Sequence, residues 1–122
     1  MPKTVMIVDD APSVRQVVGM ALKGAGYEVV EARDGKDGVA KLDGRKVNLV
    51  ICDLNMPNLD GIGFLKQIKT MEVYRFTPVI MLTTEDQQAK KEAGRAAGAK
   101  AWIVKPFNPP QLLDVVSKLI LP

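Results

Sequence analysis

The chain has 122 residues, of which 47% are hydrophobic and 25% charged, a composition typical of one globular domain and not of a disordered segment. It contains no histidine and one cysteine, which excludes an internal disulfide, Ser-His or Cys-His nucleophile systems and the usual zinc sites. There is no secretory signal pattern and no apolar stretch long enough to span a membrane, so we expect a cytoplasmic protein without membrane association. The net charge of +3 comes from interspersed basic and acidic residues without interleaved aromatic ones, which argues against nucleic-acid binding.

Five short apolar runs alternate with longer amphipathic segments along the chain. The runs cover residues 4–8, 27–30, 49–52, 79–82 and 102–104. Four of them are rich in β-branched residues and almost continuously apolar, which predicts strands buried on both faces of a parallel sheet. The run at 27–30 includes Glu28 and is followed by Glu31, so it predicts an outer strand.

The segments between the apolar runs have helical spacing of their apolar residues. They predict helices near residues 14–22, 39–42, 62–71, 85–97 and 112–120. Glycines at 24, 44 and 98 are suited to end three of these helices. Asn108 and Pro109 are typical of the N-cap and first residue of the last helix.

Five strands alternating with five helices predict an α/β domain with a parallel sheet. Since crossovers between parallel strands are right-handed, few topologies remain. We expect the flavodoxin-like doubly wound arrangement, with strand order 2-1-3-4-5 and residues 1–122 forming a single domain. In such sheets ligands bind beyond the carboxyl ends of the strands, here between the first and third.

Polar residues follow four of the predicted strands at once. These residues are Asp9 with Asp10, then Asp53, Thr83 and Lys105. Each alone would be interpreted as a cap, a turn residue or a surface charge, but all should meet at the carboxyl edge of the sheet. Three carboxylates in one cleft repel one another unless a cation joins them, and oxygen ligands suit Mg²⁺. Together with a lysine and a hydroxyl, such a site suits phosphoryl transfer, with a carboxylate as covalent acceptor.

Four segments carrying these residues resemble the motifs of CheY-like receiver domains of response regulators. The segments are Val8-Asp9-Asp10, residues 53–61 (Asp-Leu-Asn-Met-Pro-Asn-Leu-Asp-Gly), Leu82-Thr83-Thr84-Glu85 and Val104-Lys105-Pro106-Phe107. The resemblance covers the whole chain and keeps the motif order. The Asn-Met-Pro-Asn loop, and a length that leaves no room for an output domain, resemble the chemotaxis type most closely.

The resemblance implies a specific phosphorylation chemistry. Asp53 would accept a phosphoryl group from a phosphohistidine on a CheA-like sensor histidine kinase. Lys105 would pair with the acidic site and then with the phosphoryl group, and the bond between Lys105 and Pro106 would be cis. The cofactor would be Mg²⁺, with Asp9, Asp10, Asp53 and Asn55 as its ligands.

The resemblance also implies how the signal leaves the site. Thr83 would move to bond a phosphoryl oxygen, and the aromatic side chain of Trp102 would then turn inward from solvent. Receivers usually have Tyr or Phe at this position, so plain packing of Trp102 on an exposed strand face is an alternative. Asn55 and Glu85 would set how fast the phosphoryl group is lost.

The surface of the fourth helix, fifth strand and fifth helix would bind partners. Its candidate residues are Lys90, Lys91, Arg95 and Trp102, although a solvated helix face explains the three basic residues better than a binding patch does. Implied partners are a downstream target such as a flagellar motor switch protein and a phosphatase, and the chain is expected to act as a monomer.

The sequence is also compatible with other functions. The chain could serve as a phosphate sink or as an adaptor outside chemotaxis. An aspartyl-phosphate phosphohydrolase of the haloacid-dehalogenase type needs a second acidic residue two positions after the nucleophile, where this chain has Asn55. We therefore expect a self-phosphorylating and self-dephosphorylating switch, not a turnover enzyme.

Overall fold

Five parallel strands form one sheet in the computed structural model, which describes residues 2–56, 58–84 and 91–120. The strands are β1 (Thr4–Val8), β2 (Glu28–Ala32), β3 (Leu49–Asp53), β4 (Val79–Thr83) and β5 (Ala101–Val104). Their order is β2-β1-β3-β4-β5, and every neighbouring pair is parallel. The predicted flavodoxin-like sheet is therefore confirmed.

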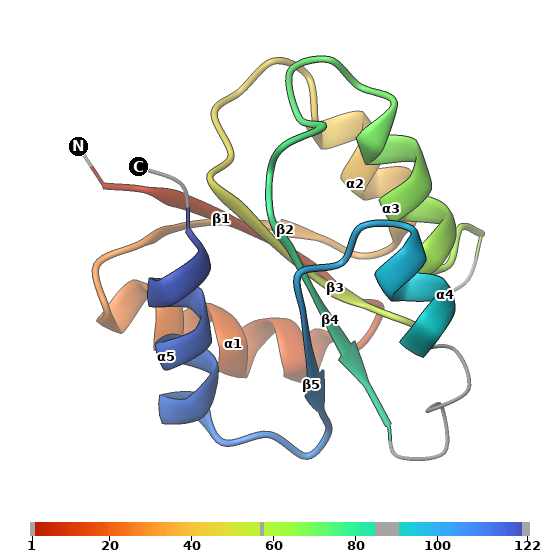
Figure 1. Ribbon diagram of the computed structural model, residues 1–122. Helices are drawn as coiled ribbons and strands as arrows, with labels where there is room; N and C mark the ends of the chain where they lie inside the picture. The colour runs from red at the N-terminus through yellow and green to blue at the C-terminus, as the bar shows by residue number, and fades with distance from the viewer. Residues whose placement is uncertain (1, 57, 85–90, 121–122) are drawn as a thin grey trace.

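Helices cover both faces of this sheet (Figure 1). Those in the described residues are α1 (Pro12–Gly24), α2 (Gly35–Lys41), α3 (Gly61–Lys69), α4 (Lys91–Ala96) and α5 (Pro109–Leu119). α1 and α5 pack on one face, while α2, α3 and α4 pack on the other. No helix in the described part of the chain is long and apolar enough to cross a membrane.

The sheet separates two apolar cores, because successive side chains of a strand point to opposite faces. On one face, residues such as Ile7 and Leu82 pack with Leu22 of α1 and Leu112 of α5. On the other face, strand residues pack around the fully buried Phe64 of α3. Every residue of β3 and β4 is buried, which explains their continuous apolar sequences.

Several element boundaries differ from the prediction by a few residues, as β2, α2 and α3 illustrate. β2 begins one residue later and ends at Ala32, because Tyr27 still donates its amide to the carbonyl of Leu22 at the end of α1. α2 begins at Gly35, where the carboxylate of Asp34 accepts the amide of Asp37 at 2.8 Å as an N-cap. α3 ends at Lys69, and its predicted last residue, Met71, lies in the following turn.

The last two helices bear on the predicted partner surface. The described part of α4 covers Lys91–Ala96, and residues 85–90 of the predicted helix lie outside the described residues. α5 begins as predicted, with the side chain of Asn108 accepting the amide of Gln111 at 3.1 Å and prolines following. Both helices lie beside β5, as Figure 1 shows.

Candidate functional site

The carboxyl ends of β1 and β3 bring the predicted acidic residues together. Val8 pairs with Cys52 in the sheet, so Asp9 and Asp53, the next residue of each chain segment, lie side by side. Asp10 follows with an exposed side chain. Carboxylate oxygens of Asp9, Asp10 and Asp53 all lie within 4.8 Å of one another. The cluster predicted from three separate motif positions is thus present as one site.

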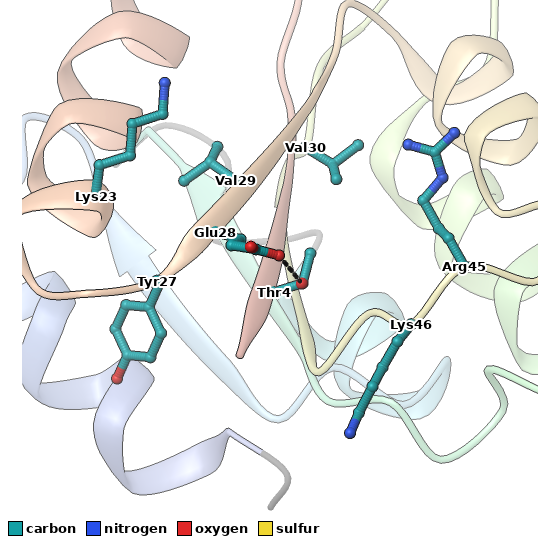
Figure 2. A pocket seen from close by; sticks show the side chains of 8 residues that line it. All are labelled: Thr4, Lys23, Tyr27, Glu28, Val29, Val30, Arg45 and Lys46. Atoms are coloured by element: carbon teal, nitrogen blue, oxygen red, sulfur yellow. Dashed lines mark hydrogen bonds between the residues drawn. The ribbon is translucent and has the colours of Figure 1, made fainter. Parts of the chain in front are cut away.

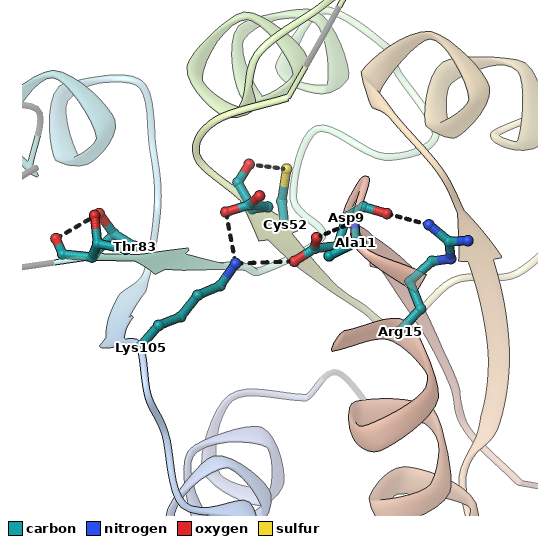
Figure 3. Close-up of polar contacts among 8 residues, drawn as sticks. Asp9, Ala11, Arg15, Cys52, Thr83 and Lys105 are labelled. Carbon is teal, nitrogen blue, oxygen red and sulfur yellow. Dashed lines mark hydrogen bonds and ion pairs between the residues drawn. The ribbon is translucent and has the colours of Figure 1, made fainter. Parts of the chain in front are cut away.

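Asp9 is held in place by the first turn of α1. Its side chain is fully buried, and its Oδ1 accepts the amide of Ala11 at 2.8 Å. Arg15 donates from Nη1 to the carbonyl oxygen of Asp9 at 2.6 Å, and its Nε lies 3.4 Å from Glu31 on β2 (Figure 3). The sequence motifs did not mark Arg15, since its contact depends on how α1 lies against the sheet. Its role here is to fix the backbone that carries Asp9 and Asp10.

Lys105 connects the two buried carboxylates across the sheet edge. It follows β5, and its Nζ lies 3.1 Å from Oδ1 of Asp53 and 3.3 Å from Oδ2 of Asp9. Figure 3 shows the side chain extended toward Asp9. The peptide bond between Lys105 and Pro106 is cis, as predicted. Lys105 therefore lies within reach of any group attached to Asp53.

The cluster carries more negative than positive charge, and this shifts the pKa values of Asp53 and Lys105. Burial raises the pKa of the Asp53 carboxyl, the charge of Asp9 raises it further, and Lys105 only partly opposes both. Burial lowers the pKa of Lys105, but the charges of Asp9 and Asp53 outweigh that effect and the net direction is upward. The site thus favours a further cation, since one positive charge faces three carboxylates.

The donor set of the site fits a hard divalent cation. It offers carboxylate oxygens from two buried residues and from the exposed Asp10, and Asn55, two residues after Asp53, is exposed at the same edge. Mg²⁺ needs few protein ligands because it keeps several waters. The exposure of Asp10 leaves the cluster open to solvent on that side.

The loop after β3 depends on Gly61. The amide of Gly61 donates to the carbonyl of Leu54 at 2.9 Å, which draws the start of α3 against the end of β3. A Cβ at Gly61 would collide with the carbonyl oxygen of Asp53 and would lie 2.6 Å from Cε of Met81. Gly61 is therefore required by close approach of two backbone segments, and its φ is not positive. Pro57 lies outside the described residues.

Thr83 and Trp102 lie on the same face of the sheet. Thr83 ends β4 with 4% of its surface exposed, and its Oγ1 donates to the carbonyl of Thr84 at 3.3 Å (Figure 3). Thr83 pairs with Val104 of β5. Trp102 lies two residues before Val104, so its side chain points to the same face of the sheet. The indole is half-buried against the core on the α3 and α4 side. The expectation that this ring starts in solvent was wrong, because α4 covers it.

The remaining predicted surface residues are only partly described. Arg95 is exposed on α4 and pairs with Glu92 at 3.2 Å, which fits a solvated helix face. Lys90 and Glu85 lie outside the described residues, as does the side chain of Lys91. Their assignment to a partner surface stays a prediction.

Cys52 is an inert core residue, as its position suggests. It is fully buried, and its Sγ donates to the carbonyl oxygen of Asp53 at 3.3 Å. Burial raises the pKa of the Cys52 thiol well above its ordinary value, so the reactive thiolate is suppressed.

A pocket at the opposite end of the sheet has different chemistry (Figure 2). It is lined by Thr4, Lys23, Tyr27, Glu28, Val29, Val30, Arg45 and Lys46. Its one carboxylate belongs to Glu28, which accepts a long hydrogen bond of 3.5 Å from Thr4. The pocket lies at the amino ends of β1 and β2, away from the acidic cluster, and its lining contains no comparable group of carboxylates.

Comparisons with known proteins agree with this geometry. Residues 5–117 match the family model of the response regulator receiver domain. The structure of the chemotaxis response regulator CheY4 of Vibrio cholerae has 43% sequence identity and a TM-score of 0.91, over 98% of this chain and 99% of that one. The receiver domain of the sensor histidine kinase PA1611 from Pseudomonas aeruginosa, solved with magnesium in its active site cleft, has 26% identity and a TM-score of 0.89, over 98% of both chains.

Curated relatives include both short and long proteins. Protein PilG of Pseudomonas aeruginosa is 36% identical over 112 residues, which make up 92% of this chain and 83% of PilG. The phosphate regulon transcriptional regulatory protein PhoB of the same species is also 36% identical, but this chain spans only 48% of its length. Since the receiver model matches nearly all of the described fold and the acidic cluster lies at its expected edge, the chain belongs to the response regulator receiver domain family.

Proposed function

We propose that this chain is a phosphorylation switch in two-component signalling, with Asp53 as the residue that accepts the phosphoryl group from a histidine kinase. The observation that carries this proposal is the meeting of Asp9, Asp10 and Asp53 with Lys105 at one edge of the sheet. Lys105 contacts both Asp9 and Asp53, but Asp9 is fully buried, whereas Asp53 keeps 7% of its surface exposed and its Oδ1 lies 3.1 Å from Nζ of Lys105. This arrangement positions both an acceptor oxygen and a cation for the transferred group.

The proposed step joins an oxygen of Asp53 to phosphorus. The bond between phosphorus and the imidazole nitrogen of the donor breaks, and its electron pair stays on that nitrogen. Lys105 exchanges part of its pairing with Asp53 for the new phosphoryl oxygens. Asp9, Asp10, Asp53 and the backbone of Asn55 would hold Mg²⁺, which when bound supplies positive charge against the phosphoryl oxygens.

The proposed output begins at Thr83. Its hydroxyl would donate to a phosphoryl oxygen on Asp53, since the two residues lie at the ends of adjacent strands. Trp102 would then move toward the space that Thr83 leaves. The partner surface in this proposal comprises α4, β5 and α5, with Lys90, Lys91 and Arg95 at its basic part. Asn55 and Glu85 would influence hydrolysis of the acyl phosphate.

Chemotaxis or motility is the proposed setting, supported by the similarity to the chemotaxis regulator CheY4. In that setting a CheA-like kinase is the donor and a motor switch protein is a downstream target. Residues 1–122 would work as a single receiver domain. Since this chain spans only part of regulators such as PhoB, the test of the setting is which proteins bind the activated chain.

Labelling by a small phosphodonor tests the proposed chemistry. With acetyl phosphate and Mg²⁺, the intact mass of the protein is expected to rise by one phosphoryl group, because Asp53 is the proposed acceptor and Asp9, the other carboxylate that contacts Lys105, is fully buried. The adduct should disappear in mild base, as acyl phosphates do, while a phosphoserine or phosphothreonine would remain. An adduct that survives base would place the acceptor on a hydroxyl and contradict the proposal.

Fluorescence of Trp102, the one tryptophan of the chain, tests the proposed output. Beryllofluoride with Mg²⁺ is expected to change its emission and its acrylamide quenching, because the ring moves from its place under α4 toward the space that Thr83 leaves. Thr83→Ala should remove most of the response, since the hydroxyl that bonds the anion is gone.

The matched control for that experiment is Thr70→Ala. Thr70 is an exposed threonine whose hydroxyl donates to Gln67 at the end of α3, away from the acidic cluster. This variant should keep the full response. Tighter partner binding with unchanged Trp102 emission and quenching would show that the signal bypasses the aromatic side chain.

A further inference from the structure

The indole of Trp102 occupies a gap in α4 that exists because residue 94 is glycine. A Cβ built on Gly94 would overlap Cζ2 of Trp102 and would lie 2.7 Å from Cη2 and 3.3 Å from Cε2. These atoms belong to the six-membered part of a rigid ring, which cannot bend away. Gly94 is buried and its φ is not positive, so its backbone would accept alanine if the ring were elsewhere.

Packing holds the ring in this position without the help of a hydrogen bond. The indole Nε1 of Trp102 is buried and has no acceptor among the described residues. A buried N–H without a partner opposes the arrangement in which it is found. The ring therefore stays under α4 because its apolar edges fit there, and that fit depends on the missing side chain at Gly94.

We propose that Gly94 is the positioning residue of the switch tryptophan, because it lets α4 close over the ring and so couples the place of the helix to the place of the indole. The coupling to signalling rests on the proposed function, while the steric pairing does not. Trp102 lies on the same sheet face as Thr83. When the ring moves toward Thr83, its edge leaves the gap at Gly94. α4 then loses the contact that sets its distance from β5.

Emission of the unphosphorylated protein tests the steric pairing directly. Gly94→Ala is expected to displace the indole from under α4, which brings water to its N–H. The emission maximum should therefore shift to longer wavelength, and acrylamide quenching should rise about twofold. Metal and phosphodonor are left out, so this result does not depend on any chemistry at Asp53.

The urea midpoint of unfolding provides a second measurement. Gly94→Ala is expected to shift it in opposite directions with and without Trp102. Alanine in place of a helix glycine usually stabilises a protein, since it restricts the unfolded chain. In the wild-type background Gly94→Ala should lower the urea midpoint, whereas in a Trp102→Leu background it should raise it. Gly19→Ala is the matched control, because a Cβ at this α1 glycine would meet its nearest atoms at 3.9 Å. Gly19→Ala should raise the midpoint in both backgrounds. In the background that keeps Trp102, it should leave the emission unchanged.

The outcomes separate the pairing from the switch. If Gly94→Ala leaves the emission unchanged and raises the midpoint with Trp102 present, the proposal is overturned. If Gly94→Ala alone does not fold but the double variant with Trp102→Leu does, the pairing is supported, while failure of both variants overturns it. If the pairing holds but beryllofluoride with Mg²⁺ never alters Trp102 emission in wild-type protein, the coupling to signalling fails. That last result would count against the proposed function of Trp102 and leave the packing role of Gly94 intact.

Discussion

Replacing Asp53 by asparagine is expected to abolish phosphorylation of the chain. An amide oxygen is a far weaker nucleophile than a carboxylate, and Asp53 is the carboxylate that Lys105 contacts at 3.1 Å. The labelling rate with acetyl phosphate and Mg²⁺ should fall on the order of 10⁴-fold or more, the scale of loss seen when an enzyme loses its nucleophile. Intact-mass spectrometry over a time course measures it.

Two controls make the Asp53→Asn result specific. Asp60→Asn changes another nearby aspartate in the same way, and because asparagine also caps helices it should keep the bond to the amide of Gly63 that begins α3. This variant should be labelled at the wild-type rate. The unfolding midpoint of Asp53→Asn should not fall, since burial and the charge of Asp9 already disfavour the Asp53 carboxylate. Full labelling of Asp53→Asn would place the acceptor on another residue.

Removing the exposed carboxylate of Asp10 is expected to remove the magnesium dependence of labelling together with most of its rate. Asp10 is the solvent-facing member of the cluster, so Asp10→Ala takes away a cation ligand without opening the core. The apparent affinity for Mg²⁺ should weaken at least about 10–100-fold, the loss caused even by changing a residue that supports a metal ligand. The measurement is the labelling rate as a function of Mg²⁺ concentration.

Thermal unfolding provides an independent measure of the same site. Mg²⁺ at ten times its dissociation constant should stabilise wild-type protein by about 1.4 kcal/mol, because it binds the folded state alone. Asp10→Ala should lose this gain. Asp114→Ala, which removes an exposed carboxylate paired with Lys118 on α5, should keep it. A chelator that leaves the labelling rate of wild-type protein unchanged would show that the cluster does not act through a divalent cation.

Much of the fold could be predicted because its signals are local. β3 and β4 are buried on both faces, and a strand in that position needs apolar residues along its length, which both sequences show up to their last residue. The edge strand β2 carries exposed glutamates for the converse reason. Once the strand order is known, residues at the carboxyl ends of β1, β3 and β5 must meet, and Asp9, Asp53 and Lys105 do so.

Contacts between distant segments could not be predicted in the same way. Arg15 fixes the backbone of Asp9 from α1, yet nothing in its sequence spacing distinguishes it from other helix arginines. β2 begins after Tyr27, the first residue of the apolar run at 27–30, because the amide of Tyr27 still bonds the carbonyl of Leu22 at the end of α1. The resemblance to receiver domains led to the expectation that the Trp102 ring starts in solvent, and nothing in its own segment indicates that α4 covers it.

The sequence by itself determined where along the chain the strands lie, which of them end in acidic residues, and hence where the candidate site lies. Only the tertiary structure decided why particular glycines are needed. Gly61 lies where the end of β3 leaves no room for a side chain, and Gly94 lies where the indole of Trp102 enters α4. Burial periodicity depends on one segment at a time and can be seen in the sequence. A gap the size of a methyl group depends on two segments placed to within less than an ångström, and packing of the whole domain sets that distance.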